Sequence, residues 1–313
     1  MYRVVSYRKV CAEDVGQRID NYLFRILKGV PKSKVYNVMR KGEVRVNKGR
    51  VKPHYRLQLD DEIRIPPIRT REQKAADPVS ESLLETLKAR IVYEDEGLLA
   101  INKPSGLAVH GGSGVSIGLI EALRQMYPEH ARLELVHRLD RDTSGCILIS
   151  KKRQVLKGIH QQLQNGGVDK AYFALVSGRM EQKLQWVEAP LLKNVLQSGE
   201  RLVRVSNQGK AAKTDFKVLE RYKDFTLLEA KPITGRTHQI RVHAQYIGHP
   251  IVGDSRYGDE YGNKLAKKAG INRLFLHAHR LRFVNPSTEK PIEIVADLDG
   301  GLAENLGQLE KIE

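Results

Sequence analysis

Residues 137–149 read His137-Arg138-Leu139-Asp140-Arg141-Asp142-Thr143-Ser144-Gly145-Cys146-Ile147-Leu148-Ile149, a polar turn that runs directly into an apolar strand. Asp140 and Asp142 are typical of turns, where their side chains cap backbone N–H groups while the Thr-Ser-Gly segment closes the turn. The alternative is chemical: a neighbouring arginine favours the charged form of a carboxylate, and an ionised aspartate is a nucleophile. The residues by themselves leave both interpretations open.

A second polar turn, residues 234–243, reads Thr-Gly-Arg-Thr-His-Gln-Ile-Arg-Val-His and leads into a helix for which Thr237 is the expected N-cap. Two arginines, one of them Arg241, lie close to the start of this helix. Cations there oppose the helix dipole, so an anion is expected nearby, unless the helix face is simply solvated. His238 and His243 are five positions apart, whereas a metal-binding helix places its histidines four apart, so the segment predicts no zinc site.

Between the two turns, residues 170–176 (Lys-Ala-Tyr-Phe-Ala-Leu-Val) alternate like a strand, with Tyr172 and Ala174 on one face. A tyrosine on a strand is usually a packing residue, and the alternative is that its ring stacks on a substrate ring. Upstream, residues 102–112 (NKPSGLAVHGG) form neither a P-loop nor a dinucleotide fingerprint, which disfavours nucleotide hydrolysis. The chain has no H-x-E and no CxxC, which excludes a zinc-dependent base deaminase.

The order of apolar segments predicts an α+β protein with a central mixed, mainly antiparallel sheet. Short strands are expected at the following segments: 98–101, 146–149, 172–176, 225–230 and 274–276. Helices are expected at 119–125, 154–164 and 238–247. Proline and polar residues interrupt residues 67–88, which we interpret as a linker between a small domain, 1–66, and a larger catalytic domain, 89–313.

The N-terminal quarter carries most of the chain's charge. Residues 1–75 hold 19 Lys and Arg against 8 Asp and Glu, a net charge of +11 out of +16 for the whole chain. Helical spacing over residues 16–27 and 32–40, followed by strand alternation at 44–46, 57–59 and 63–65, predicts a helix-helix-strand unit. The second helix presents four basic residues, a surface suited to phosphates: Lys32, Lys34, Arg40 and Lys41. Nucleic acid is the expected partner.

Other classes of protein are disfavoured by composition. No uncharged apolar run approaches the roughly 18 residues of a membrane span, and the first residues lack the apolar core of a signal peptide. Cys11 and Cys146 form no metal-binding pair and no even disulfide framework, so both are expected to be reduced. We therefore expect a cytoplasmic protein with no membrane partner.

These motifs, taken together and in this order, resemble the RluA-type pseudouridine synthases. The matching stretches are NKPSGLAVHGG, HRLDRDTSG, KAYFALV, TGRTHQIRVH and RLFLHA, and they cover nearly all of residues 91–297. Residues 17–65 resemble the alpha-L RNA-binding module of ribosomal small-subunit protein four. The resemblance implies a pseudouridine synthase fold that isomerises uridine to pseudouridine in structured ribosomal RNA of the large subunit (23S), without metal or organic cofactor.

The resemblance also implies roles for five residues. The family pattern H-R-L-D-x-x-T-S-G places the nucleophile at Asp140, since Asp142 occupies a variable position, and its partner at Arg241. Tyr172 matches a tyrosine that lies against the uracil, and a role as the base that removes the carbon-5 proton is left open for it. Arg138 matches an arginine that enters the helical stack when the target base leaves, and Ile240 is expected to line the uracil pocket.

Two other functions remain compatible with the residues. A non-catalytic RNA-binding factor in ribosome assembly would use the N-terminal module alone, and Asp140 would be a turn residue. A phosphate-processing enzyme would use the His and Arg clusters on a phosphodiester, although paired metal-binding carboxylates are missing. We expect a monomer acting on structured ribosomal RNA.

Overall fold

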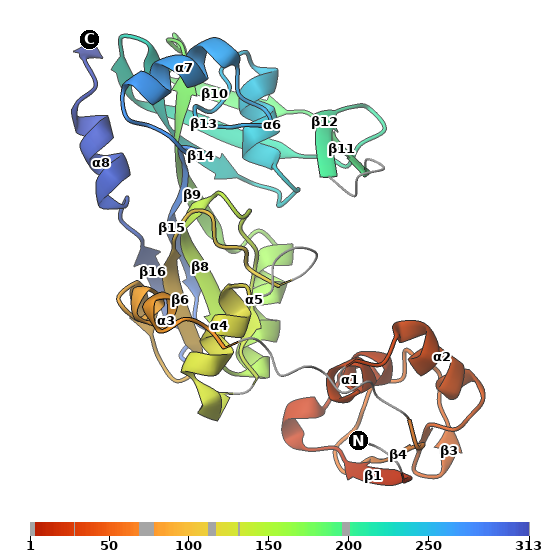
Figure 1. The fold of residues 1–313 in the computed structure, drawn as a ribbon. Helices are drawn as coiled ribbons and strands as arrows, with labels where there is room; N and C mark the ends of the chain where they lie inside the picture. Colours follow the sequence, from red (N-terminus) through yellow and green to blue (C-terminus); the bar gives the residue numbers. More distant parts are fainter. Residues whose placement is uncertain are drawn as a thin grey trace. The chain divides into compact units, whose positions relative to one another are not determined.

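The computed structural model describes residues 4–27, 29–68, 78–111, 117–130, 132–195 and 201–312. The chain forms two compact units, Met1–Pro78 and Val79–Glu313 (Figure 1). Each unit has its own hydrophobic core, so each is described by itself.

The N-terminal unit packs two helices on a small antiparallel sheet whose strand order is β1-β4-β2-β3. Its elements are β1 (Ser6–Lys9), a 3-10 turn (Ala12–Asp14), α1 (Ile19–Ile26), α2 (Lys32–Arg40), β2 (Arg45–Val46), β3 (Gly49–Arg50) and β4 (Glu62–Ile65). Ile19 and Leu23 of α1 and Val35 and Val38 of α2 are fully or almost fully buried, as the helical spacing of their apolar residues predicts. The strand expected at residues 57–59 is wrong. Leu57 is buried outside any strand.

The expected linker, residues 67–88, differs from the structure at its C-terminal end. Residues 69–77 lie outside the described residues. The last eight residues form α3 (Glu81–Lys88), which Ser80 caps by accepting a hydrogen bond from the backbone N–H of Leu83 at 3.4 Å. Leu87 is completely buried in the core of the C-terminal unit, so the helix belongs to that unit. Its polar face accounts for the linker-like composition.

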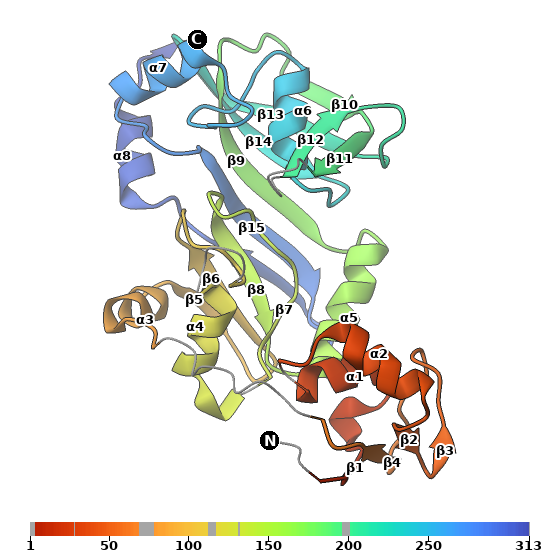
Figure 2. The same cartoon turned by 45° about the vertical axis from the view of Figure 1, so that its right-hand side comes forward.

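The C-terminal unit is built on an eleven-stranded sheet. Its main path runs β10-β13-β14-β9-β15-β8-β6-β5 (Figure 2). Outside this path, β16 pairs with β15, β17 with β13, and β7 with β8. The strands are β5 (Ile91–Glu94), β6 (Leu98–Lys103), β7 (Glu134–Leu135), β8 (Ser144–Ser150), β9 (Asp169–Ser177), β10 (Leu184–Glu188), β13 (Lys213–Tyr222), β14 (Phe225–Pro232), β15 (Leu276–Val284), β16 (Pro291–Val295) and β17 (Lys311–Ile312). A separate hairpin joins β11 (Leu191–Val195) to β12 (Arg201–Val205).

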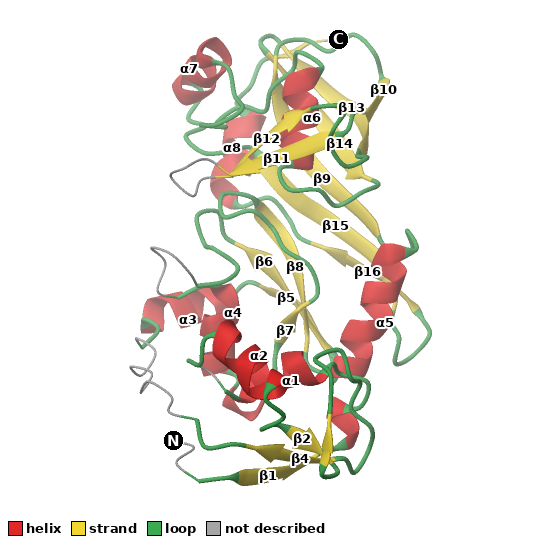
Figure 3. Ribbon diagram, turned by 90° about the vertical axis from the view of Figure 1, so that its right-hand side faces the viewer, coloured by secondary structure: helices red, strands yellow, loops and turns green. Residues whose placement is uncertain are grey.

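Helices cover both faces of this sheet (Figure 3). They are α3, α4 (Leu119–Met126), α5 (Arg153–Gln164), α6 (Gln239–Tyr246), α7 (Glu260–Lys268) and α8 (Gly300–Gly307), with a 3-10 turn at Pro128–His130. Strand β8 is buried along its whole length because Ile147 and Ile149 join the core under α3 and α4, while Cys146 and Leu148 join the core under α5. Burial on both faces explains its uninterrupted apolar sequence. The prediction of a mixed, mainly antiparallel sheet in an α+β protein is confirmed.

The parallel pairing of β8 with β15 determines where the motifs meet. Ala278 of β15 pairs with Gly145 of β8 on one side and with Tyr172 of β9 on the other, so these three residues form one row across the sheet. Gly145 has a φ of +108°, and a Cβ placed on it would lie 2.3 Å from the carbonyl oxygen of Ala278. Only glycine fits there. The row brings the turn before β8 close to Tyr172.

None of the helices within the described ranges is both long and apolar enough to cross a bilayer.

Candidate active site

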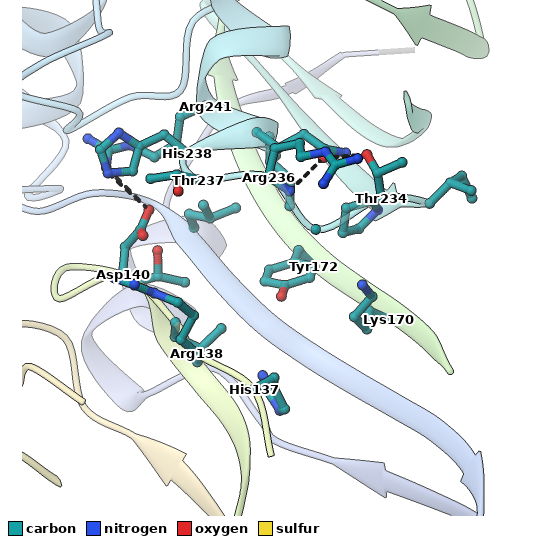
Figure 4. Close-up of a pocket in the computed structure, with 18 of the residues that line it drawn as sticks. His137, Arg138, Asp140, Lys170, Tyr172, Thr234, Arg236, Thr237, His238 and Arg241 are labelled. Atoms are coloured by element: carbon teal, nitrogen blue, oxygen red, sulfur yellow. Dashed lines mark hydrogen bonds and ion pairs between the residues drawn. The ribbon is translucent and has the colours of Figure 1, made fainter. Parts of the chain in front are cut away.

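A pocket of about 530 Å³ lies where three segments of the C-terminal unit meet (Figure 4). They are the turn that precedes β8, the beginning of β9, and the connection from β14 into α6. The lining includes all five residues of this unit that the sequence analysis singled out: Arg138, Asp140, Tyr172, Ile240 and Arg241. Segments distant in sequence therefore converge on one cavity.

A buried lysine immobilises the turn that carries Asp140. Lys103, at the end of β6, is fully buried, and its ammonium group donates to the carbonyl oxygens of Pro104, Leu107 and Arg141, each at 2.9 Å. Burial lowers the pKa of Lys103 to about 7, against the opposing effect of nearby carboxylates. Because the carbonyl of Arg141 also accepts the N–H of Gly106 at 2.9 Å, the backbone next to Asp140 is held from two directions.

The other end of the turn is fixed by a buried histidine. The Nε2 atom of His277 lies 2.9 Å from the carbonyl oxygen of Ala296, which can only accept, so Nε2 carries the proton. Its Nδ1 atom then accepts a hydrogen bond from the hydroxyl of Ser144 at 2.9 Å. Burial lowers the pKa of His277 to about 4, which keeps the ring neutral. Ser144 and Gly145 of the motif therefore have structural roles.

The cation beside Asp140 comes from α6 and not from its own segment. Nη1 of Arg241 lies 3.5 Å from Oδ2 of Asp140, whereas Arg141 approaches Asp142 at 3.8 Å on the exposed surface. Arg241 is itself held by Asp254, whose two carboxylate oxygens accept from its Nε and Nη2 atoms at 2.7 Å. The carboxylate of Asp254 is completely buried. This bidentate geometry orients the guanidinium and leaves Nη1 directed at Asp140.

Burial and charge act in opposite directions on the Arg241–Asp254 pair. Burial disfavours the charged form of Asp254, but hydrogen bonds and attraction from Arg241, with further bonds from backbone N–H groups, lower its pKa below the ordinary value. Burial likewise disfavours the Arg241 cation, and Asp254 and Asp140 together raise its pKa. Both groups are therefore ionised at neutral pH, and the site holds a permanent positive charge against Asp140.

Helix α6 begins one residue later than its sequence suggests. The expected cap, Thr237, is wrong, because the N-cap is His238, whose backbone is left-handed with a φ of 54°. Gln239 instead holds the turn before the helix, since its side-chain oxygen accepts from the backbone N–H of Arg236 at 3.0 Å and from the hydroxyl of Thr234 at 2.6 Å. This arrangement turns the His238 ring toward Asp140, with Nε2 at 3.8 Å from Oδ2.

Tyr172 and Ile240 belong to the apolar part of the pocket lining. Ile240 is 6% exposed and packs in the core that α6 makes with the sheet, while the Tyr172 ring is partly buried against the same core. Burial raises the pKa of the Tyr172 phenol well above its usual range, and the Asp140 carboxylate adds to this effect. The phenol is therefore neutral at physiological pH. Arg138 also lines the pocket and is solvent-exposed.

Three of the basic residues predicted in the first unit lie on α2, and the fourth, Lys41, is its C-cap. All four side chains are exposed, as expected for a charged face opposite the buried apolar stripe: Lys32, Lys34, Arg40 and Lys41. They belong to a different unit from the pocket. Within the described ranges, no three His, Cys, Asp or Glu side chains gather in a way that could hold a metal ion.

Sequence reasoning missed four residues in or beside the site. Asp254 and Tyr257 belong to the turn GDSRYG, residues 253–258, whose only signal is a glycine-flanked aspartate, a pattern typical of any turn. His238 was considered only as a metal ligand. Lys103 stood in a quoted motif, but nothing in its neighbours indicates that its ammonium group would be buried.

Comparison with known proteins is consistent over both units. Residues 97–246 match the family model described as RNA pseudouridylate synthase, and residues 17–63 match the S4 domain. The chain is 53% identical over 311 residues to "Ribosomal large subunit pseudouridine synthase C" of Pasteurella multocida, covering 99% of this chain and 95% of that protein. It is 55% identical over 304 residues to the protein of the same name from Escherichia coli (strain K12), covering 96% and 95%.

Solved structures agree with the sequence comparisons. "Human RNA Pseudouridylate Synthase Domain Containing 4" superimposes with a TM-score of 0.60 and 27% identity, covering 73% of this chain and 97% of that one. "Human RNA Pseudouridylate Synthase Domain Containing 1" gives a TM-score of 0.56 and 25% identity, covering 76% and 100%. Identity above one half along nearly the whole length is decisive: the chain belongs to the RluA-type pseudouridine synthases and carries an S4 domain in its N-terminal unit.

Proposed function

We propose that this protein isomerises uridines to pseudouridine in ribosomal RNA of the large subunit, with Asp140 as the nucleophile. The observation that carries the proposal is the 3.5 Å approach of Arg241 to Asp140 at a pocket also lined by Tyr172. The relatives that are 53–55% identical are named as synthases for that RNA. The target base leaves the helical stack to reach the pocket, and Arg138 fills part of the space it vacates.

The proposed chemistry is redox-neutral and needs no co-substrate. Asp140 forms a transient covalent bond with the nucleotide, the bond between ring nitrogen-1 and the sugar breaks, and the uracil turns. Carbon-5 then bonds to the sugar's anomeric carbon and loses its proton, while nitrogen-1 gains one. The bond to Asp140 breaks, which frees the carboxylate for the next turnover, so that atoms balance. Tyr172 and Ile240 form the surface against which the ring turns, and stacking of a base on an aromatic ring contributes about 1–3 kcal/mol.

The state of Tyr172 bears on proton removal from carbon-5. Because burial and Asp140 raise the pKa of the phenol, the phenolate that would act as a base is scarce at neutral pH. We propose that its main role is to stack on the uracil. Tyr172→Phe tests this directly, since it keeps the ring and removes the hydroxyl. Retained activity supports stacking, and loss comparable to that of an Asp140 variant supports proton transfer.

Release of tritium from carbon-5 of uracil tests the reaction. Large-subunit RNA labelled at carbon-5 is incubated with the full-length protein, and tritium in water is counted. We expect release by wild type and none above background by Asp140→Asn. Asp142→Asn is the matched control, because Asp142 is two residues away and 54% exposed. Equal release by wild type and Asp140→Asn refutes the nucleophile, and no release by wild type, with RNA binding intact, favours the assembly-factor alternative.

We further propose that α2 of the N-terminal unit contacts RNA phosphates and that the protein acts as a cytoplasmic monomer. Four exposed cations support the first part: Lys32, Lys34, Arg40 and Lys41. Replacing all four by glutamine should weaken RNA binding and make it less dependent on salt, since fewer counterions are then released. An unchanged salt slope contradicts the proposed contact. Light scattering of the purified protein checks the oligomeric state.

A further inference from the structure

His238 stands out because its backbone is strained and its ring faces the proposed nucleophile. Its φ of 54° and ψ of 20° lie in the left-handed region, which costs a residue other than glycine about 1 kcal/mol or more. Its side chain is only 10% exposed. Strain of this kind persists where the surroundings fix the conformation, and here the fixing partner is Tyr257.

The hydrogen bonds of Tyr257 determine which nitrogen of His238 carries the proton. The Tyr257 hydroxyl accepts from the backbone N–H of Val203 at 3.0 Å and lies 2.8 Å from Nδ1 of His238. Tyr257 is 3% exposed, and in the described part of the chain its hydroxyl proton has no other acceptor. The hydroxyl therefore donates to Nδ1, and the proton of the neutral ring sits on Nε2.

The protonated nitrogen faces Asp140. Nε2 lies 3.8 Å from Oδ2, the same oxygen that Nη1 of Arg241 approaches at 3.5 Å. Within the residues that the structure describes, Oδ1 of Asp140 has no hydrogen-bond or ion-pair partner. Two donors thus converge on one oxygen and leave the other available for attack. The His238 ring and Asp140 face one another in Figure 4.

The charges around the ring favour its neutral form. Burial lowers the pKa of His238, and Arg241 and Arg256 act in the same direction, against the opposing effects of Asp140 and Asp254. An imidazolium would have to lose the hydrogen bond from Tyr257, since both of its nitrogens would be donors. Geometry and charge therefore agree on a neutral ring with its N–H toward the carboxylate.

The turn of residues 253–258 supports both groups that face Asp140, the Arg241 guanidinium and the His238 ring. Oδ1 of Asp254 accepts the backbone N–H groups of Arg256 at 2.9 Å and Tyr257 at 3.0 Å, in addition to its bond with Arg241. The Tyr257 ring also lies under the Arg241 guanidinium, with the carbon of that group 4.9 Å from the ring centre. A displacement of Tyr257 would move both partners of Asp140.

We propose that His238 is a positioning residue that, as the neutral Nε2–H tautomer, holds Oδ2 of Asp140, and that Tyr257 selects this tautomer. At 3.8 Å the contact is longer than a hydrogen bond and acts through the N–H dipole. It shortens to a hydrogen bond when RNA expels water from the pocket. Oδ1 is then the attacking atom. The kinetic consequences rest on the proposed function, whereas the tautomer does not.

Nuclear magnetic resonance of the full-length protein tests the tautomer without reference to activity. With 15N-labelled histidine, two-bond correlations distinguish protonated from unprotonated ring nitrogens, and the signals missing from His238→Gln identify the residue. We expect the Nε2–H tautomer at neutral pH in wild type and a change toward Nδ1–H in Tyr257→Phe. A proton on Nδ1, or on both nitrogens, in wild type overturns the proposal.

Tritium-release kinetics test the consequence for catalysis. Tyr257→Phe keeps the ring beneath Arg241 and removes only the hydroxyl, so kcat should fall on the order of tenfold with little change in KM. In the His238→Gln variant, adding Tyr257→Phe should not lower kcat further, because the glutamine side chain has no tautomers for the Tyr257 hydroxyl to select. If the fold-losses in kcat of the two single variants multiply in the double variant, the Tyr257 hydroxyl acts independently of His238, and the proposal is refuted. Tyr261→Phe, 71% exposed on α7, is the matched control.

Discussion

Replacement of Asp254 by asparagine tests the idea that a buried ion pair orients Arg241. The substitution keeps the shape of the side chain and removes its charge, while Arg241 remains 7% exposed with its cation unneutralised. Breaking a buried pair from one side costs about 3–5 kcal/mol. Asparagine retains one acceptor, so we expect the lower value, about 3 kcal/mol. For a domain of this size that corresponds to a fall in Tm of roughly 6–12 °C.

Asp254→Asn should also lower the activity of the folded protein, beyond any loss caused by unfolding. Without the bidentate bonds the guanidinium is free to rotate, and Nη1 is no longer directed at Asp140. A displacement of about 1 Å at a reacting group can cost roughly 10²-fold in rate, and we expect a loss of that order in tritium release at a temperature where the variant is folded. Differential scanning calorimetry measures Tm, and circular dichroism verifies the fold.

A surface ion pair provides the comparison. Glu96 lies 2.9 Å from Lys152, but its side chain is 91% exposed, so Glu96→Gln should leave Tm and activity unchanged. The reasoning is refuted if Asp254→Asn also melts at the wild-type temperature and retains wild-type tritium release. That result would mean that the Arg241 side chain is fixed by its packing and not by its partner.

The Asp254 carboxylate should also make the free energy of unfolding depend on pH, and the sign of this dependence follows from its pKa. The folded-state pKa of Asp254 is lowered, so between that value and the unfolded value the unfolded chain binds more protons, and the free energy of unfolding rises with pH. Its contribution is complete above the ordinary aspartate pKa of about 3.9 and is lost as pH falls toward the folded value. Asp254→Asn should therefore lose less stability than wild type on acidification. Calorimetry from pH 6 downward, at about half-unit steps, measures this difference.

Three further substitutions test residues that hold or line the pocket. Lys103→Met removes the ammonium donor from three backbone carbonyls, of which that of Arg141 keeps its bond from the N–H of Gly106. The free energy of unfolding should therefore fall by about 3 kcal/mol in denaturant titration, and tritium release should fall with it. Gly145→Ala forces a Cβ against Ala278 and should lower Tm much more than Gly166→Ala, where the φ is also positive but nothing lies within 4 Å. Lys170→Gln removes a cation from the pocket wall and should reduce the slope of log K against log salt by about 0.7–0.9, as loss of one phosphate contact requires.

The sequence predicts the elements of this fold better than their limits. Apolar periodicity identifies the strand β8, expected at 146–149 and observed at Ser144–Ser150, and the helix beginning at Leu119, because each buries a continuous face. It fails where apolar residues are buried outside a strand. A strand is expected at 274–276, and Leu274 and Phe275 are buried, yet β15 begins only at Leu276. It also fails where the expected cap, Thr237, is replaced by a strained histidine held through tertiary contacts.

The family motifs predict which residues meet, but not what holds them. That Asp140, Tyr172 and Arg241 share a pocket follows from the resemblance, because each lies in a matching stretch. That Asp254 orients Arg241 does not follow, since its turn has no distinctive composition and its burial depends on tertiary packing, in which the neighbouring Gly253 lies against the backbone of Arg273. A supporting partner is defined by three-dimensional contact, and its sequence signal is correspondingly weak.

The parallel pair at the centre of the sheet explains why this chain can hold a carboxylate against a distant guanidinium. Antiparallel neighbours place the end of one strand beside the start of the next, whereas a parallel pair places two strand beginnings side by side. Ser144 is the first residue of β8 and His277 the second of β15, and their hydrogen bond ties the two strand beginnings together. The turn carrying Asp140 is therefore fixed to the strand that pairs with β9, and Tyr172 lies in the adjacent row, opposite Ala278. If that reasoning holds, His277→Ala should release the turn and reduce activity without removing any group that lines the pocket.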